Sequence, residues 1–286
     1  MKIQARFYET YELCGIVDAV LRDPFEHARM LEAFHCDDQW TGLVRPFEKN
    51  SALHQFISFI VHDAYTEQAD AVELDSRKRM FKNFAKYPDA IDDLKPNLLP
   101  IEIAFKYHGI EHTSFEEHLA TSGRSFEDAT SDDIFDYTRE LWLDKSYEDL
   151  VTQTVAEIFH VLYQNRSLLV RFNQYVSAII AEADFSKVEA LPAHLFSSNR
   201  TLIRARPPSW AQRAVFFRDR GRCVLCDKDL SGITNLANVE NYDHIIPLAK
   251  FGLNDVSNLQ LLCGECNQHE KKDGAAITSN IYQSWF

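Results

Sequence analysis

Hydrophobic residues recur every three or four positions from Tyr147 to Ala183, the spacing of an amphipathic α-helix. The pattern breaks near Asn165, so we predict two consecutive helices, one on each side of this residue. Both apolar stripes are expected to face the core. The stripes consist of Leu150, Thr154, Ile158 and Leu162, followed by Leu168, Phe172, Val176 and Ile179.

The preceding region also has helical composition. Leu53–Tyr65 and Ser76–Tyr87 are predicted helices. Another helix is expected to start at Asp23, because Pro24 suits a first turn and Glu26 stands three positions after the cap. This part of the chain is therefore expected to be mainly α-helical.

Proline and small polar residues between Pro192 and Pro208 predict a linker. We therefore divide the chain into an acidic, mainly α-helical domain at 1–196, a linker at 197–208 and a C-terminal domain at 209–286.

A short helix is predicted immediately after this linker. Ser209 is expected to cap it, and Trp210, Ala214 and Phe217 fall on one apolar side. Gly221 is expected to allow the turn that follows the helix.

Charge is distributed unevenly over the 286 residues. Residues 201–286 contain ten Lys or Arg and nine Asp or Glu, so the net charge of −13 divides into +1 for this part and −14 for residues 1–200. An acidic surface repels phosphate, so the N-terminal part is not expected to be the main DNA-binding surface. The stretch Arg200–Arg222 contains seven arginines and one acid, Asp219, which predicts a phosphate-contacting arm.

The N-terminus has no apolar run typical of a signal peptide. No segment reaches the roughly 18 uninterrupted apolar residues of a transmembrane helix. We therefore expect a cytoplasmic protein without membrane contact, in which Cys14 and Cys36 are ordinary reduced core residues.

The four remaining cysteines form two CxxC pairs, which can present four thiolates tetrahedrally to one zinc ion. The 36 residues between the pairs exceed the spacing of an ordinary zinc ribbon and leave room for a further unit. Disulfides or free thiols are a poorer interpretation, because so small a segment needs a stabilising cross-link and the chain is expected to be intracellular. A structural Zn²⁺ is thus predicted at Cys223, Cys226, Cys263 and Cys266.

Polar residues between and beside these pairs suit phosphodiester hydrolysis. Asp243 offers a carboxylate oxygen and Asn267 an amide oxygen, which are hard ligands that suit Mg²⁺ better than zinc. His244 titrates near neutrality and can take a proton from water. Neighbouring residues on a strand point to opposite faces, so a strand end or a bulge is expected at Asp243 and His244.

The stretch Asn241–Lys272 resembles the HNH nucleases, the ββα-metal family that cuts nucleic-acid phosphodiesters. The resemblance extends roughly over Ser209–Lys272 and rests on a DHIIPL run, an NLQLLC run and the two CxxC pairs in order. It implies an α+β protein, in which a mostly helical N-terminal domain precedes a small C-terminal ββα-metal domain stapled by zinc.

The resemblance also implies roles for individual residues. Asp243 and Asn267 would bind a catalytic Mg²⁺ or Mn²⁺, His244 would be the general base, and Asn258 would hold the loop and orient the histidine. The sequence departs from the family at Asp227, where the family often has glycine.

Nucleic-acid contacts are expected on both sides of this motif. Arg213 and Arg220 fall outside the apolar side of the predicted helix, and the family usually has an Arg-Asp pair before the first cysteine. If a helix begins near Cys266, Asn267 and Lys271 share a face, whereas the alternative metal ligand His269 lies on another. The predicted nucleic-acid-binding residues are Arg213, Arg218, Arg220 and Lys271.

These features predict a metal-dependent DNA endonuclease that nicks one strand per active site. Small bacterial HNH proteins with a long extra domain often act in restriction or phage defence, which implies antiviral defence and a partner protein for the N-terminal domain. Two alternatives stay open: a structure-specific repair or recombination nuclease, and a catalytically silent, zinc-stapled nucleic-acid adaptor.

Overall fold

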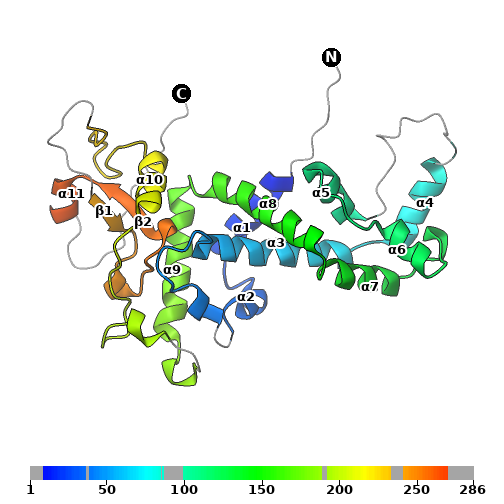
Figure 1. Ribbon diagram of the computed structural model, residues 1–286, viewed down its shortest axis with the longest axis horizontal. Helices are drawn as coiled ribbons and strands as arrows, with labels where there is room; N and C mark the ends of the chain where they lie inside the picture. Colours follow the sequence, from blue (N-terminus) through cyan, green and yellow to red (C-terminus); the bar gives the residue numbers. More distant parts are fainter. Residues whose placement is uncertain are drawn as a thin grey trace, which may run out of the picture. The chain divides into compact units, whose positions relative to one another are not determined.

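The described residues of the computed structural model form eleven α-helices, two β-strands and several short 3₁₀ helices (Figure 1). Helices make up most of the residues that the structure describes and a small ββα unit comes last, which confirms the predicted α+β class. Among these helices, none is long and apolar enough to cross a membrane. The structure describes residues 9–36, 39–84, 86, 99–188, 192–232 and 241–269.

The chain forms two compact units that do not follow its order. The first consists of Met1–Leu13 and Ser58–Ile158, and the second of Cys14–Ile57 and Phe159–Phe286. The second unit therefore combines the cysteine-containing C-terminal part with two helical segments from earlier in the chain. The sequence analysis divided the chain at a linker, residues 197–208, into parts that could fold independently. That division stays a prediction.

A buried glutamate joins two helices of the first unit. Glu102 accepts hydrogen bonds from the backbone N–H of Leu99 at 2.8 Å and of Phe115 at 3.1 Å, so one carboxylate holds the starts of two helices. The unit contains α4 (Leu74–Phe84), α5 (Pro100–His108), α6 (Phe115–Thr121) and α7 (Ser131–Leu141), with parts of α3 (Ala52–Asp70) and α8 (Lys145–Leu162).

The periodic stretch of the sequence forms α8 and α9 (Arg166–Glu182). The predicted break is confirmed, because the Asn165 side chain caps α9 by accepting a hydrogen bond from Leu168 N at 3.1 Å. The predicted stripe is buried except at its last position. Ile180, rather than Ile179, completes it, because the buried positions of α9 continue in steps of four.

One predicted helix start is wrong by four residues. Residues 24–27 form a turn and α2 (Ala28–His35) begins only at Ala28. Asp23 accepts a long 3.4 Å hydrogen bond from Glu26 N, so it closes the turn instead of capping a helix. The preceding helix, α1 (Glu9–Arg22), ends just before this turn.

An aromatic cluster forms much of the core of the second unit. The ring centroid of Phe56 lies 5.1 Å from that of Phe34 and 5.5 Å from that of Phe172. The buried Trp40 packs against Phe185 at 5.2 Å. Segments from both parts of this unit therefore share one core.

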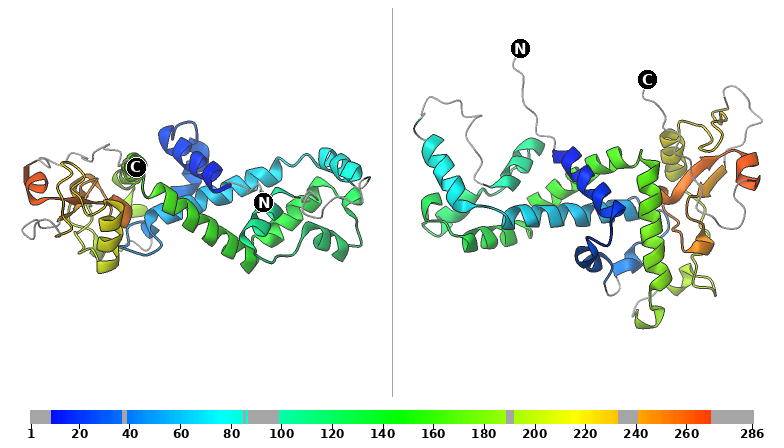
Figure 2. Two further views of the ribbon diagram at one scale, coloured as in Figure 1. Left: turned by 90° about the horizontal axis from the view of Figure 1, so that it is seen from above. Right: turned by 180° about the vertical axis from the view of Figure 1, so that it is seen from behind.

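The ββα unit stands at the C-terminal end of the described chain. Strands β1 (Asn241–His244) and β2 (Leu259–Leu262) pair antiparallel, and α11 (Gly264–His269) follows and packs on β1. Helix α10 (Ser209–Arg218) packs on β2, and the four elements lie together in every view (Figures 1 and 2). All four residues of β2 are buried.

Helix α10 buries a different side from the predicted one. Ala211, Val215 and Arg218 are buried, whereas Phe217, predicted to face inward, is 75% exposed. The cause is a buried ion pair between Arg218 and Asp219, which turns the arginine toward the sheet. Pro208 occupies the cap position, and Ser209, predicted to be the cap, is the first residue of the helix.

Candidate active site and metal centre

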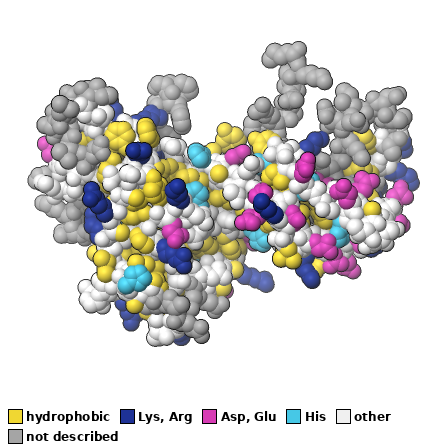
Figure 3. Space-filling view, in the orientation of Figure 1, with side chains coloured by type: hydrophobic (Ala, Val, Ile, Leu, Met, Phe, Trp, Pro, Cys, Tyr) yellow, Lys and Arg dark blue, Asp and Glu magenta, His cyan; other side chains and the backbone are white. Residues whose placement is uncertain are grey.

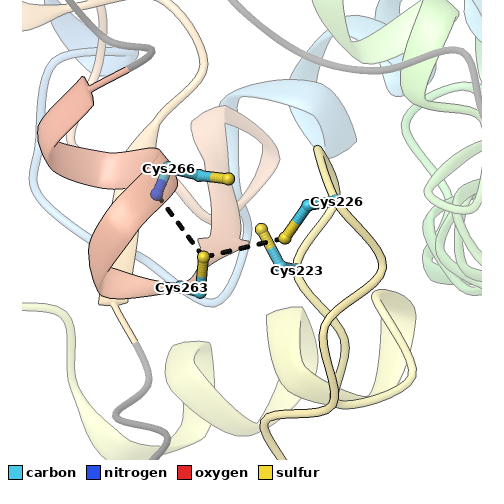
Figure 4. Close-up of side chains that lie close together, drawn as sticks. All are labelled: Cys223, Cys226, Cys263 and Cys266. Carbon is cyan, nitrogen blue, oxygen red and sulfur yellow. Dashed lines mark hydrogen bonds between the residues drawn. The ribbon is translucent and has the colours of Figure 1, made fainter.

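The four cysteines of the two CxxC pairs converge, with all their Sγ atoms within 4.8 Å of one another (Figure 4). The Sγ atoms of Cys226 and Cys263 are 3.7 Å apart. That distance matches the edge of a tetrahedron with zinc–sulfur bonds of about 2.3 Å, and far exceeds a disulfide bond of about 2.05 Å. The donor set and its spacing therefore fit the predicted structural zinc ion.

The turn before the first pair depends on Gly221. Its φ is +61°, and a Cβ atom here would lie 2.7 Å from Cζ of Phe216. Because only glycine combines this left-handed conformation with so close a neighbour, the expectation for Gly221 is met. Asp227, where the family often has glycine, has a φ of +58°, which gives that preference a physical reason.

Hydrogen bonds attach the first knuckle, the turn that contains Cys223 and Cys226, to the sheet. Cys223 N donates to the carbonyl of Lys228 at 2.9 Å, and Val224 N donates to the carbonyl of Leu261 at 3.0 Å. The Nζ atom of Lys228 lies 3.1 Å from a carboxylate oxygen of Glu265, which lies between the two cysteines of the second pair. Burial opposes ionisation of the Cys223 thiol, but backbone donors including Cys263 N lower its pKa below the ordinary value, which favours the thiolate.

Arg218 is a buried structural residue, which is incompatible with its predicted contact to nucleic acid. Its guanidinium makes two 2.9 Å hydrogen bonds to Asp219 and one of 2.6 Å to the carbonyl of Leu259. Asp219 in turn accepts from Leu261 N at 2.9 Å. Burial alone would lower the pKa of Arg218, but the charge of Asp219 raises it. The pair therefore anchors β2 to α10.

Asp243 and His244 are the last two residues of β1, opposite Gln260 and Leu259. The sequence predicted either a strand end or a bulge here. Pairing with β2 is regular up to His244, so the structure has the strand end and not the bulge. Asp243 is 5% exposed and His244 1% exposed. As neighbours on a strand, they point to opposite faces.

Asn258 clamps the loop between the two strands. Its Oδ1 accepts a hydrogen bond from Ile246 N at 2.8 Å, and its Nδ2 donates to the carbonyls of Ile246 at 3.0 Å and Leu253 at 2.9 Å. The backbone carbonyl of Asn258 accepts from Ile245 N at 2.7 Å. A Cβ atom at Gly252 would lie 1.9 Å from the Ile246 oxygen, so the loop closes tightly. These contacts fix the backbone immediately after His244.

Two loop residues that the sequence analysis did not single out connect this loop to the rest of the second unit. Asn254 accepts a hydrogen bond from Ala205 N at 3.1 Å and donates to the carbonyl of Ile203 at 2.8 Å. The buried Asp255 accepts from Ala52 N at 3.0 Å, at the start of α3. Burial raises the pKa of Asp255. The Asp-x-Ser spacing of an Asx turn at Asp255 was a visible signal, but its helix partner was not.

Helix α9 also contacts this loop. Asn173 donates through Nδ2 to the carbonyl of Ser257 at 3.1 Å, and the Tyr163 hydroxyl donates to the carbonyl of Val256 at 3.5 Å. The guanidinium of Arg218 lies 4.9 Å from the centre of the Tyr163 ring. Sequence analysis placed Asn173 and Tyr163 in or beside core helices only, because the loop residues to which they bond lie more than 80 residues away.

The remaining predicted residues are distributed as follows. Asn267 is half-buried on α11, the helix that packs on β1, and β1 carries Asp243. Arg213 and Arg220 are exposed. Lys271 lies outside the described residues, as does the side chain of His269.

Comparison with known proteins identifies a family for part of the chain. Residues 223–279 match the family model HNH_5, described as HNH endonuclease. The match starts at the first CxxC cysteine, so it does not extend to Ser209–Arg222 as the resemblance suggested. No curated protein and no solved structure matches the chain. The described part of the matched segment has the ββα order implied by the resemblance, so residues 223–279 are similar to HNH endonucleases.

Proposed function

We propose that the protein is a divalent-metal-dependent DNA endonuclease that nicks one strand per active site. The observation that carries the proposal is the clamped end of β1, where Asn258 holds the backbone directly after Asp243 and His244 within a matched HNH segment. A rigid backbone at this point keeps a general base in a constant position, as acid–base catalysis requires.

In the proposed reaction, His244 takes a proton from a water molecule that attacks the phosphorus atom. A bond forms between the water oxygen and phosphorus, and the bond from phosphorus to the 3′ oxygen breaks. The products are a 5′-phosphate and a 3′-hydroxyl, after the leaving oxygen has gained a proton from solvent.

Asp243 and Asn267 are the proposed ligands of the catalytic ion, since they offer hard oxygen donors from β1 and from the helix packed on it. A bound Mg²⁺ or Mn²⁺ would stabilise negative charge on the phosphate. The four cysteines would hold Zn²⁺ in a closed structural site.

DNA is the proposed partner, and the arginine-rich stretch before the first CxxC pair is the proposed contact. Asp219, the only acid between Arg200 and Arg222, is fully buried, so the exposed charges of this stretch are positive. Asn254 holds the segment that carries the exposed Arg204 and Arg206 next to the loop after β1. Arg213, Arg220 and Lys271 remain proposed contacts.

The proposed biological role is restriction or antiviral defence in the cytoplasm, with a partner protein bound by the helical N-terminal part. The support is the resemblance of a short HNH segment on a longer chain to bacterial defence nucleases, which is an analogy of organisation.

The full-length protein, incubated with supercoiled plasmid in Mg²⁺ or Mn²⁺, is expected to convert the plasmid to the nicked circle. Chelation of the divalent ion should stop the reaction. Linear duplex DNA and RNA in parallel reactions define the substrate class. A pure, zinc-loaded protein that leaves all these nucleic acids intact would favour the silent adaptor.

A further inference from the structure

The solvent side of α10 combines an exposed aromatic ring with positive charge. Phe217 is 75% exposed, and Arg213, four residues earlier, is also exposed. Residues four apart lie on the same face of a helix. Arg220, just after the helix end, is exposed as well, and Trp210 is half-buried.

The packing of α10 fixes this orientation. Ala211, Val215 and Arg218 are buried, and Arg218 is tied to β2 by its hydrogen bond to Leu259. At 3.6 residues per turn, Arg213 and Phe217 lie on the side of the helix opposite to these three residues. Rotating Phe217 inward would expose the buried Arg218–Asp219 pair, so the ring is held outward.

The one acid in the sequence between Arg200 and Arg222 adds no negative charge to this surface. Asp219 is 0% exposed and is bonded to Arg218 and to Leu261 N. In the space-filling view, hydrophobic and Lys or Arg side chains lie next to each other over the region of α10 (Figure 3). The surface is therefore suited to a polyanion that also offers flat apolar faces.

We infer that this surface, formed by Trp210, Arg213, Phe217 and Arg220, binds unpaired nucleotides of DNA, with Phe217 stacking on a base. In a duplex both faces of each base are covered by its neighbours, whereas an unpaired base can stack on an aromatic side chain while arginines bind the adjacent phosphates. The inference rests on the proposed function and names its substrate class: DNA that contains a single-stranded or locally unpaired stretch.

The test measures binding separately from cleavage, with the full-length chain carrying His244→Ala. Fluorescence anisotropy gives the affinity for a labelled single-stranded oligonucleotide, a matched duplex and a duplex with a central unpaired loop. Phe217→Ala should weaken binding to the first and third by about 5- to 150-fold, the range expected for one base–aromatic stack, and to the matched duplex by less than about twofold.

Three further variants separate stacking from other effects. Phe217→Trp should keep or raise the affinity for single strands, whereas Phe217→Leu, which retains apolar bulk, should lose it. Arg213→Ala should weaken binding to all three DNAs and reduce the salt dependence by about one phosphate contact. Phe25→Ala removes a ring that is 92% exposed elsewhere in the second unit and should leave binding unchanged.

The inference is overturned if Phe217→Ala binds single strands like its parent, or if it weakens all three DNAs equally. A change in oligomeric mass on Phe217→Ala, with DNA binding unaltered, would also overturn it and assign the ring to a protein interface. Plasmid nicking by the protein with native His244 is scored separately. If the protein nicks plasmid but Phe217→Ala does not change DNA binding, the proposed function stands and only the inference fails. If Phe217→Ala weakens binding but the protein does not nick plasmid, only the proposed function fails.

Discussion

His244 ends β1 with 1% of its surface exposed, next to a loop that Asn258 holds through both its amide oxygen and its amide nitrogen. Loss of the imidazole should therefore leave the backbone in place, because the loop is fixed by a different residue. His244 is thus proposed to move a proton, whereas Asn258 positions the backbone around it.

His244→Ala is expected to reduce the rate of plasmid nicking by about 10²- to 10⁴-fold, the usual effect of losing a general base. Zinc content, melting temperature and DNA affinity should stay close to those of the parent. His194→Ala, at an exposed histidine of the same unit, serves as the control. Near-normal nicking by His244→Ala would contradict the proposed mechanism.

Gly221→Ala is expected to destabilise the protein by about 1–3 kcal/mol, because the new methyl group would meet the Phe216 ring in a left-handed backbone conformation. Gly15→Ala is the matched comparison, since Gly15 lies within α1 and has no atom within 4 Å of its Cβ position. That variant should gain up to about 1 kcal/mol through helix propensity. Urea denaturation measures the change in stability of both variants. An unchanged midpoint for Gly221→Ala would show that the added methyl group causes no strain.

Glu9 is a buried residue of the first unit whose ionisation opposes folding. Burial, followed by the charge of Glu12, raises its pKa from 4.5 to about 7. Between these values the folded state retains a proton that the unfolded state has lost, so Glu9 lowers the stability as pH rises. The penalty approaches about 3 kcal/mol above pH 7.

Glu9→Gln should therefore stabilise the protein more at pH 8 than at pH 5.5, as measured by urea denaturation at both values. The exposed Glu26→Gln should show no such dependence. A gain for Glu9→Gln that does not change between the two pH values would show that the carboxylate does not titrate abnormally.

At the scale of elements, β2 is held from several sides. The Arg218–Asp219 pair joins it to α10, Val224 N of the first knuckle bonds to Leu261, and the second CxxC pair begins directly after the strand at Cys263. The knuckle and the strands should therefore unfold together.

Cys223→Ser is expected to release zinc and to lower the melting temperature markedly, because structural zinc binding is coupled to folding. Asp243→Ala and Asn267→Ala should instead lose nicking with zinc retained. Elemental analysis of the purified proteins, together with thermal melts, distinguishes the two classes. Active wild-type protein without zinc would rule out the Cys₄ assignment.

At the scale of the whole molecule, the loop between β1 and β2 contacts residues that precede the predicted linker. Asp255 caps α3 at Ala52, Phe47 N donates to the carbonyl of Asn254 at 2.8 Å, and Asn173 of α9 bonds to Ser257. All these partners precede residue 197. The segment that matches the HNH model is therefore part of a larger compact unit, although its sequence pattern is local.

A fragment of residues 197–286 should consequently be less stable than the same segment in the full chain. Removing these partners takes away the hydrogen bond that Asp255 accepts from Ala52 N and the one that Asn173 donates to Ser257, at about 0.5–1.5 kcal/mol for each bond. We expect a lower melting temperature and faster zinc loss to a chelator. A fragment that melts and retains zinc like the full chain would instead support the predicted independent domain.

Sequence alone determined the local features. Periodicity located α8, α9 and the break at Asn165, and the two CxxC pairs identified four cysteines whose sulfur atoms do converge. The order of the ββα unit followed from the family resemblance. Helix periodicity and metal spacing depend on residues close in the chain, so they can be read without knowing the fold.

Tertiary structure decided which side of α10 faces inward. Composition favoured Phe217 for the core, but Arg218 is buried because Asp219, Leu259 and Tyr163 together satisfy its charge. Burying an arginine is tolerated only where such partners meet, and two of these partners lie about 40 and 55 residues away in the chain. Their meeting, and with it the exposure of Phe217, depends on contacts between distant segments, which no local pattern records.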